Sequence, residues 1–170
     1  MPTARFQASS EGLLRWTGHE VRCALGRSGV TPATAKREGD GASPIGAWPI
    51  RQVLWRPDRL ARPTTALPLA ELIPEAGWCD DPADPFYNRP VVLPYPASHE
   101  KLWRDDAIYD VIVELGYNDD PVLPGRGSAI FLHVARPDYS PTEGCIACAL
   151  PDLLVLLADA RPGDTIEITP

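Results

Sequence analysis

Two residues in the last third of the chain have the types and spacing of a nucleophile and its base. His133 lies near the end of an apolar run, "SAIFLHVA", and Cys145 follows twelve residues later within "PTEGCIAC". A cysteine attacks as its thiolate, and a neighbouring imidazolium lowers the thiol pKa from its ordinary ~8.5. A histidine can then return the proton to a leaving amine. Gly144 lets the backbone turn tightly, and amides at 144–146 could hold a developing oxyanion. The pattern predicts acyl transfer.

The same residues have other interpretations. A histidine on an apolar strand can be an ordinary core residue, and a buried cysteine is usually inert packing. Cys145 and Cys148 have the C-x-x-C spacing of a redox pair, but the βαβ context of such pairs is missing. With His133 they could also form a zinc site like that of nucleobase deaminases, although Val134 and Ala135 stand where those enzymes have H-x-E. Spacing alone leaves these alternatives open.

A rigid sheet is needed to hold such residues on its loops. Valine- and isoleucine-rich runs predict strands at 47–55, 109–117 and 128–135, the last buried on both faces, and "DTIEITP" predicts a final strand. Residues 11–30 predict a hairpin that turns at Gly18 and His19. "PDLLVLLADARPG" predicts a helix, with Pro151 near its first position and Asp152 in its first turn.

Glycine and proline predict irregular structure elsewhere. Residues 31–46 carry glycine, proline and charge without an apolar period, which predicts a loop. From 57 to 96 prolines recur every few residues and leave no room for a long element. "SHEKLWR", which follows, predicts a short helical turn. No domain boundary is visible, so we expect one mainly-β domain over 1–170.

Composition excludes several classes of function. The chain has 170 residues, 44% of them hydrophobic, and a net charge of -7, which argues against a nucleic-acid binder. No apolar window reaches the ~20 residues of a membrane span. Four cysteines are too few for a disulfide scaffold. The N-terminus shows no apolar signal-peptide segment, which would place a complete chain in the cytoplasm unless it is exported by another route.

Three ordered stretches resemble the L,D-transpeptidase catalytic domain family, of the YkuD type. "FLHVARPDYSPTEGCIAC" is similar to its strand histidine, loop and Ser/Thr-His-Gly-Cys motif, with Glu143 in place of the second histidine. "KREGDGASPIGAWPI" (36–50) is similar to its K-x-G-D-x-x-T-P-x-G-x-[FW]-x-I segment. "LGYNDDPVLPGRGSAIFLH" is similar to the approach to the histidine in a short-form branch. The stretches cover most of 36–150 in the family's order.

The resemblance implies a mainly-β, sandwich- or barrel-like core with one helix near the C-terminus, and no cofactor or metal. It implies that Cys145 is the nucleophile and His133 the general base and acid. Ala147 stands where many members have arginine or asparagine, so another arginine would have to hold a substrate carboxylate. The other candidates for oxyanion or substrate binding are Gly144, Glu143, Thr142, Arg136, Arg126 and Tyr117.

The resemblance also implies a substrate and a place. The expected donor is a peptidoglycan stem peptide, cut after its third residue, and the expected acceptor is an amine. Water as the acceptor would make the protein a carboxypeptidase or endopeptidase instead. Glu143 and Ala147 also leave open a non-catalytic peptidoglycan-binding module. Glu143 could orient a loop amide, meet the amine of a diamino acid, or simply be solvated. Peptidoglycan lies in the cell envelope, so the resemblance favours that location.

Overall fold

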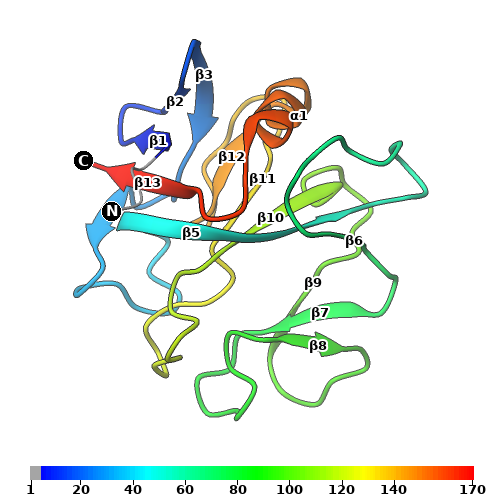
Figure 1. The fold of residues 1–170 in the computed structure, drawn as a ribbon. Coiled ribbons are helices and arrows are strands. Elements are labelled where there is room, and N and C mark those ends of the chain that lie inside the picture. The colour runs from blue at the N-terminus through cyan, green and yellow to red at the C-terminus, as the bar shows by residue number, and fades with distance from the viewer. Residues whose placement is uncertain (1–4) are drawn as a thin grey trace.

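Short strands joined by proline-rich loops make up most of the computed structural model, which describes residues 5–170 (Figure 1). There is one helix in this part of the chain, α1 (Leu150–Asp159). The strands are β1 (Phe6–Ser9), β2 (Leu13–Trp16), β3 (His19–Ala24), β4 (Val30–Pro32), β5 (Ser43–Trp55), β6 (Leu69–Glu71), β7 (Ala76–Cys79), β8 (Pro90–Val92), β9 (His99–Lys101), β10 (Val111–Leu115), β11 (Phe131–Val134), β12 (Ile146–Cys148) and β13 (Thr165–Thr169). The predicted mainly-β class with one C-terminal helix is confirmed.

The larger sheet closes on itself. Its strands pair in the order β10-β11-β12-β3-β2-β1-β13-β5, and β5 pairs with β10 to complete the circuit. β4 and β6 extend it beside β5. Most neighbours in the circuit are antiparallel, but β1 runs parallel to β13, and β11 runs parallel to β12. A parallel pair needs a crossover connection, and for β11 and β12 that connection is the loop from 135 to 145, which carries the predicted nucleophile to the sheet.

Strands β10 and β11 are buried on both faces because each face has its own apolar cover. Val113 and Leu132 belong to the large cluster that fills the closed sheet. Ile112 and Phe131 belong to a second cluster on the outside. That cluster includes Trp78 of β7, a strand of the separate three-stranded sheet β8-β7-β9, which lies below β10 in Figure 1. The prediction of a doubly buried run at 128–135 is confirmed.

Helix α1 follows directly after β12. Pro151 lies in its first turn, where a missing N–H has no helical partner to lose, and Asp152 complements the positive end of the helix dipole. Leu153, Leu156 and Leu157 are buried in the large cluster, at the i, i+3, i+4 spacing of one helix face. The helix therefore anchors the end of β12 to the core. Its ten residues fall short of what a membrane-crossing helix requires.

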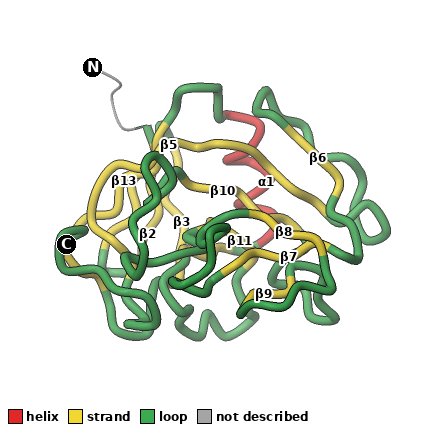
Figure 2. The backbone as a smooth tube through the Cα atoms, turned by 90° about the horizontal axis from the view of Figure 1, so that it is seen from below, coloured by secondary structure: helices red, strands yellow, loops and turns green. Residues whose placement is uncertain are grey.

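Several boundaries differ from the sequence prediction. "SHEKLWR" does not form a helical turn; His99–Lys101 is strand β9, paired antiparallel with β7, because cross-strand pairing overrides a weak local preference. The hairpin at 11–30 is confirmed, but His19 is the first residue of β3 and not part of the turn. Residues 31–46 are not all loop, because β4 extends to Pro32 and β5 already begins at Ser43. Between 57 and 96 only short strands occur, as predicted, and loops dominate there (Figure 2).

Candidate active site

A cleft of about 450 Å³ lies over the outer side of β11 and β12. Both predicted catalytic residues line it: His133 lies on β11, and Cys145 lies immediately before β12. The wall opposite comes from the residues around β7 and β9. The lining residues are Lys36, Glu38, Gly39, Asp80, Glu100, Arg104, Ile108, Tyr109, Ser128, Ala129, His133, Arg136, Ser140, Pro141, Thr142, Glu143, Cys145 and Ala147.

Cys145 lies immediately before β12 and is buried in the outer cluster. Its thiol donates to the carbonyl oxygen of Ala129 at 3.1 Å, and the N–H of Phe131 points at its sulfur at 3.4 Å. Burial raises the pKa of the Cys145 thiol to about 12, and the nearby Glu100 carboxylate adds to this. The Phe131 N–H acts in the opposite direction. Cys145 is therefore a protonated thiol at rest, although the Phe131 N–H would stabilise its thiolate.

His133 lies on β11, opposite Ile112 of β10. Its Nδ1 is 3.0 Å from the carbonyl oxygen of Val134. A carbonyl can only accept, so Nδ1 carries the proton and Nε2 is left as an acceptor. The ring packs edge-on against Tyr109, with 5.2 Å between the ring centroids. Burial lowers the pKa of His133 to about 4, although the bond to Val134 opposes this shift.

The two residues therefore form a neutral pair at rest. Within residues 5–170 the hydrogen bonds of the Cys145 sulfur go to Ala129 and Phe131, and none joins it to His133. The sequence suggested that an imidazolium would lower the thiol pKa, but burial keeps the proton on sulfur and off the ring. A neutral imidazole with a free Nε2 can instead accept the thiol proton as attack proceeds.

Thr142 and Gly144 shape the turn before the cysteine. Thr142 Oγ1 donates to the carbonyl of Cys145 at 2.6 Å and accepts from the Gly144 N–H at 3.1 Å. Gly144 has φ +136°, and a Cβ there would lie 2.9 Å from the carbonyl oxygen of Ala42. Only glycine fits this combination of backbone angle and close approach. Both residues thus hold the turn that precedes the nucleophile.

The remaining predicted residues divide into two groups. Arg136 and Glu143 lie at the cleft. Glu143 is largely exposed and pairs with Arg27 at 2.9 Å. Tyr117 and Arg126 are absent from the lining: the Tyr117 hydroxyl donates to the Arg126 carbonyl, and both residues border a separate shallow depression. The structure therefore brings Arg136, and not Arg126, to the candidate site.

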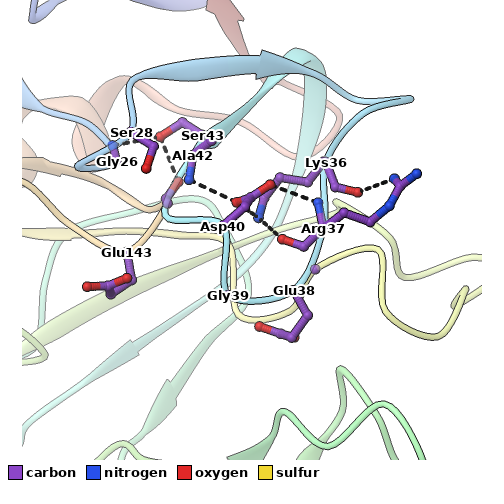
Figure 3. Close-up of polar contacts among 12 residues, drawn as sticks. Gly26, Ser28, Lys36, Arg37, Glu38, Gly39, Asp40, Ala42, Ser43 and Glu143 are labelled. Atoms are coloured by element: carbon purple, nitrogen blue, oxygen red, sulfur yellow. Dashed lines mark hydrogen bonds and ion pairs between the residues drawn. The ribbon is translucent and has the colours of Figure 1, made fainter.

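Charged residues from distant segments complete the cleft, and the sequence did not single them out as site residues. Lys36 is buried and donates to Asp40 at 2.7 Å, in the loop that Figure 3 shows beside Glu143. Glu100 accepts a hydrogen bond from the hydroxyl group of Tyr109. Burial raises the pKa of Glu100. The segment 36–50, which resembles a family motif, contains Lys36, so the sequence held a signal for that residue. Glu100 lies in "SHEKLWR", for which the sequence predicts a helical turn in place of the observed strand β9.

The structure also bears on the rival interpretations of Cys148. Its side chain belongs to the cluster inside the closed sheet, opposite Cys23 on β3, whereas Cys145 belongs to the outer cluster. The two thiols of the C-x-x-C spacing therefore face different sides of the sheet. Among residues 5–170 no group of three histidine, cysteine or acidic side chains is arranged to hold a metal ion.

The family of the chain is given by comparison with protein-family models. Residues 5–168 match the L,D-transpeptidase catalytic domain family. Among solved structures, L,D-transpeptidase 1 from Mycobacterium tuberculosis aligns with 99% of this chain at 15% identity and a TM-score of 0.42. The chain spans 62% of the length of that protein. This similarity is too low to carry over individual residues. No curated protein matches the sequence significantly.

Proposed function

Because the chain belongs to the L,D-transpeptidase catalytic domain family, we propose that it is a cysteine acyltransferase, with Cys145 as nucleophile and His133 as general base and acid. The observation that carries the proposal is that both residues line one cleft, in which the Nδ1–H of His133 donates a hydrogen bond to the carbonyl oxygen of Val134. That bond leaves Nε2 able to take a proton and give it back.

The reaction begins from the neutral pair. The sulfur of Cys145 forms a bond to the substrate carbonyl carbon while its proton passes to Nε2 of His133. The carbonyl oxygen becomes an oxyanion. When the tetrahedral intermediate collapses, the carbon–nitrogen bond breaks, and the imidazolium returns its proton to the leaving amine. An acyl-enzyme thioester remains. An incoming acceptor then loses its proton to His133 and forms a bond to the acyl carbon. The carbon–sulfur bond breaks, and the imidazolium returns this proton to the sulfur, which restores the neutral pair.

The substrate that we propose is a peptidoglycan stem peptide, with an amine as acceptor. The family implies this class, and the cleft is lined by both signs of charge, which suits a peptide that carries carboxylates and an ammonium. Arg136 and Arg104 supply the positive groups, and Glu100 and Asp80 the negative ones. We place the activity at the cell envelope, where peptidoglycan is found.

Glu143 stands where the wider family has the second motif histidine. We therefore assign the chain to a short-form branch in which a carboxylate replaces that histidine. Glu143 ties its loop to Arg27 through the ion pair at 2.9 Å. Since it is exposed at the cleft, it could also meet the ammonium of a diamino acid. Neither role requires an imidazole, so His133 suffices as the base.

The test is the mass of the intact protein after incubation with a carbapenem. We expect one covalent adduct, located on the peptide that contains Cys145, and no adduct on the Cys145→Ala variant. Cys148→Ala is the matched control, since it removes a buried thiol that faces the other side of the sheet, and it should be acylated like the wild type. Full labelling of Cys145→Ala would refute the assignment.

A second measurement decides the fate of the acyl-enzyme. A stem tetrapeptide is supplied with and without an acceptor amine, and the products are identified by mass. A transpeptidase gives the cross-linked product when the amine is present. Tripeptide alone under both conditions would instead identify a carboxypeptidase, and no turnover with an intact, unreactive Cys145 would identify a binding module.

A further inference from the structure

Three loop segments that are distant in sequence meet directly behind the nucleophile. The N–H of Arg27 donates to the carbonyl of Thr142 at 2.7 Å, and the N–H of Thr142 donates to the carbonyl of Leu25 at 3.0 Å. The N–H of Ser28 reaches the carbonyl of Gly41 at 2.9 Å. Figure 3 shows residues 26–28 and 42–43 side by side, with Glu143 on the adjacent loop. The nucleophile loop is thus hydrogen-bonded to residues 25–27, and this segment is in turn hydrogen-bonded to Gly41, just before β5.

Ser43 lies at the centre of this junction and is fully buried. Its Oγ accepts the N–H of Gly26 at 3.0 Å and donates to the carbonyl oxygen of Gly144 at 2.8 Å. Because the Gly26 N–H already occupies the acceptor side, the hydroxyl proton is directed at Gly144. A buried hydroxyl with both roles filled is a fixed anchor, and not an adjustable one.

The carbonyl that Ser43 holds shares its peptide unit with the N–H of Cys145. In a trans peptide these two groups point in opposite directions. The Cys145 N–H therefore points away from Ser43, and since Ser43 is fully buried whereas Cys145 borders the cleft, we infer that the N–H faces the cleft. Within residues 5–170 this N–H donates to no acceptor. It is therefore a free donor next to the attacking sulfur.

We propose that Ser43 is a positioning residue: by anchoring the Gly144 carbonyl, it holds the Cys145 N–H in the orientation that stabilises the oxyanion. This inference rests on the proposed acyl transfer at Cys145. A donor aimed in advance at developing charge lowers the barrier because it need not reorganise during the reaction.

The need for an anchor follows from Gly144 itself. A glycine has little resistance to rotation of its peptide units, and this one cannot be replaced because a Cβ would meet the carbonyl of Ala42 at 2.9 Å. The same holds for Gly26, whose N–H donates to the Ser43 hydroxyl: a Cβ there would lie 2.3 Å from the carbonyl oxygen of Gly41. Close backbone packing thus demands glycine, and the hydroxyl of Ser43 supplies the restraint on orientation that the glycine lacks.

The experiment compares two reactions of the same sulfur. Acylation by a carbapenem develops an oxyanion, whereas alkylation by iodoacetamide displaces iodide and develops none. For Ser43→Ala we expect carbapenem acylation to slow by about 10- to 100-fold, while alkylation of Cys145, followed by peptide mapping, stays within about twofold of the wild type. Ser43→Thr keeps the hydroxyl and should recover most of the acylation rate.

Matched controls separate this role from general stability. Ser9→Ala removes another buried hydroxyl, one that makes no hydrogen bond with the described residues, and should leave both rates unchanged. If Ser43→Ala does not fold, Ser43→Cys offers a weaker donor of similar size and should give an intermediate acylation rate; a wild-type rate there would refute the role.

Other outcomes are equally decisive. Wild-type acylation by Ser43→Ala, or an equal loss of acylation and alkylation, would overturn the assignment, the latter because it would indicate a loosened loop without any effect specific to the oxyanion. A wild-type protein that is alkylated at Cys145 but never acylated would reject the proposed function itself, and this inference with it.

Discussion

The thiol of Cys145 donates a hydrogen bond to the carbonyl oxygen of Ala129, sixteen residues earlier in the chain. Ala129 has φ +54°, in the left-handed region that a residue with a Cβ seldom adopts. The buried side chain of Asn88 accepts the N–H of Ala129 at 3.0 Å and so helps to hold it there. The resting position of the sulfur is therefore set by a residue with a strained backbone just before β11, and attack must begin by breaking this bond.

The reactivity of Cys145 toward a small electrophile should follow its raised pKa. Since burial raises the pKa of the thiol to about 12, the thiolate fraction rises about tenfold per pH unit up to that value. We expect the rate of iodoacetamide alkylation, measured by peptide mapping, to climb without a plateau from pH 6 to pH 10. Cys23, whose pKa burial also raises to about 12, provides the internal comparison. A plateau near neutrality would reveal an ion pair with His133.

His133 should make the protein less stable in acid. Its folded pKa of about 4 lies below the ordinary value of 6.5, so between these values the unfolded chain binds a proton that the folded chain does not. The free energy of unfolding then falls as the pH drops from 6.5 toward 4, by about 3 kcal/mol. His133→Asn, which keeps a donor for Val134, should flatten urea-unfolding stability over this interval. An unchanged slope would contradict the assigned shift.

Asn88 should be costly to remove because its amide serves four partners. Its Oδ1 accepts from Trp78 Nε1 and the Ala129 N–H, and its Nδ2 donates to the carbonyls of Tyr117 and Asn118. Asn88→Ala leaves these groups without their partner, and we expect a loss of about 3 kcal/mol or more in unfolding free energy.

A second substitution at this position separates the lost bonds from backbone strain. Asn88 has φ +55°, so Asn88→Gly should be about 1 kcal/mol more stable than Asn88→Ala. Equal unfolding midpoints in urea for the wild type and Asn88→Ala would show that the hydrogen bonds of the Asn88 amide do not stabilise the fold.

Two ion pairs offer a direct contrast between burial and exposure. Asp40 pairs with Lys36, whose side chain is 3% exposed, whereas Glu143 pairs with Arg27, and both of those side chains are mostly exposed. Asp40→Asn leaves a buried ammonium with a weaker partner and should cost about 3 kcal/mol. Glu143→Gln should change stability by less than about 1 kcal/mol. Chemical unfolding of both variants in parallel measures the difference, and similar losses would mean that burial of Lys36 does not matter.

Local sequence patterns anticipated the elements whose signals are themselves local. The apolar run at 128–135 became β11, and the Pro151-Asp152 start with its leucine spacing became α1. By contrast, β9 and β12 are three-residue strands that exist because a partner lies beside them. Such pairing depends on which segments meet in space, so periodicity over three residues cannot reveal it.

For the candidate site, the sequence by itself determined the chemical inventory: a strand-borne histidine, a glycine-supported cysteine and the loop between them, all within 133–145. Tertiary structure decided what these groups are at rest. It enclosed Cys145 and His133 so deeply that both are neutral, brought Glu100 to the cleft from a distant strand, and placed Ser43 behind the nucleophile loop. The reason is that protonation and orientation depend on solvent exclusion and on contacts between distant segments, and neither is a property of neighbours in sequence.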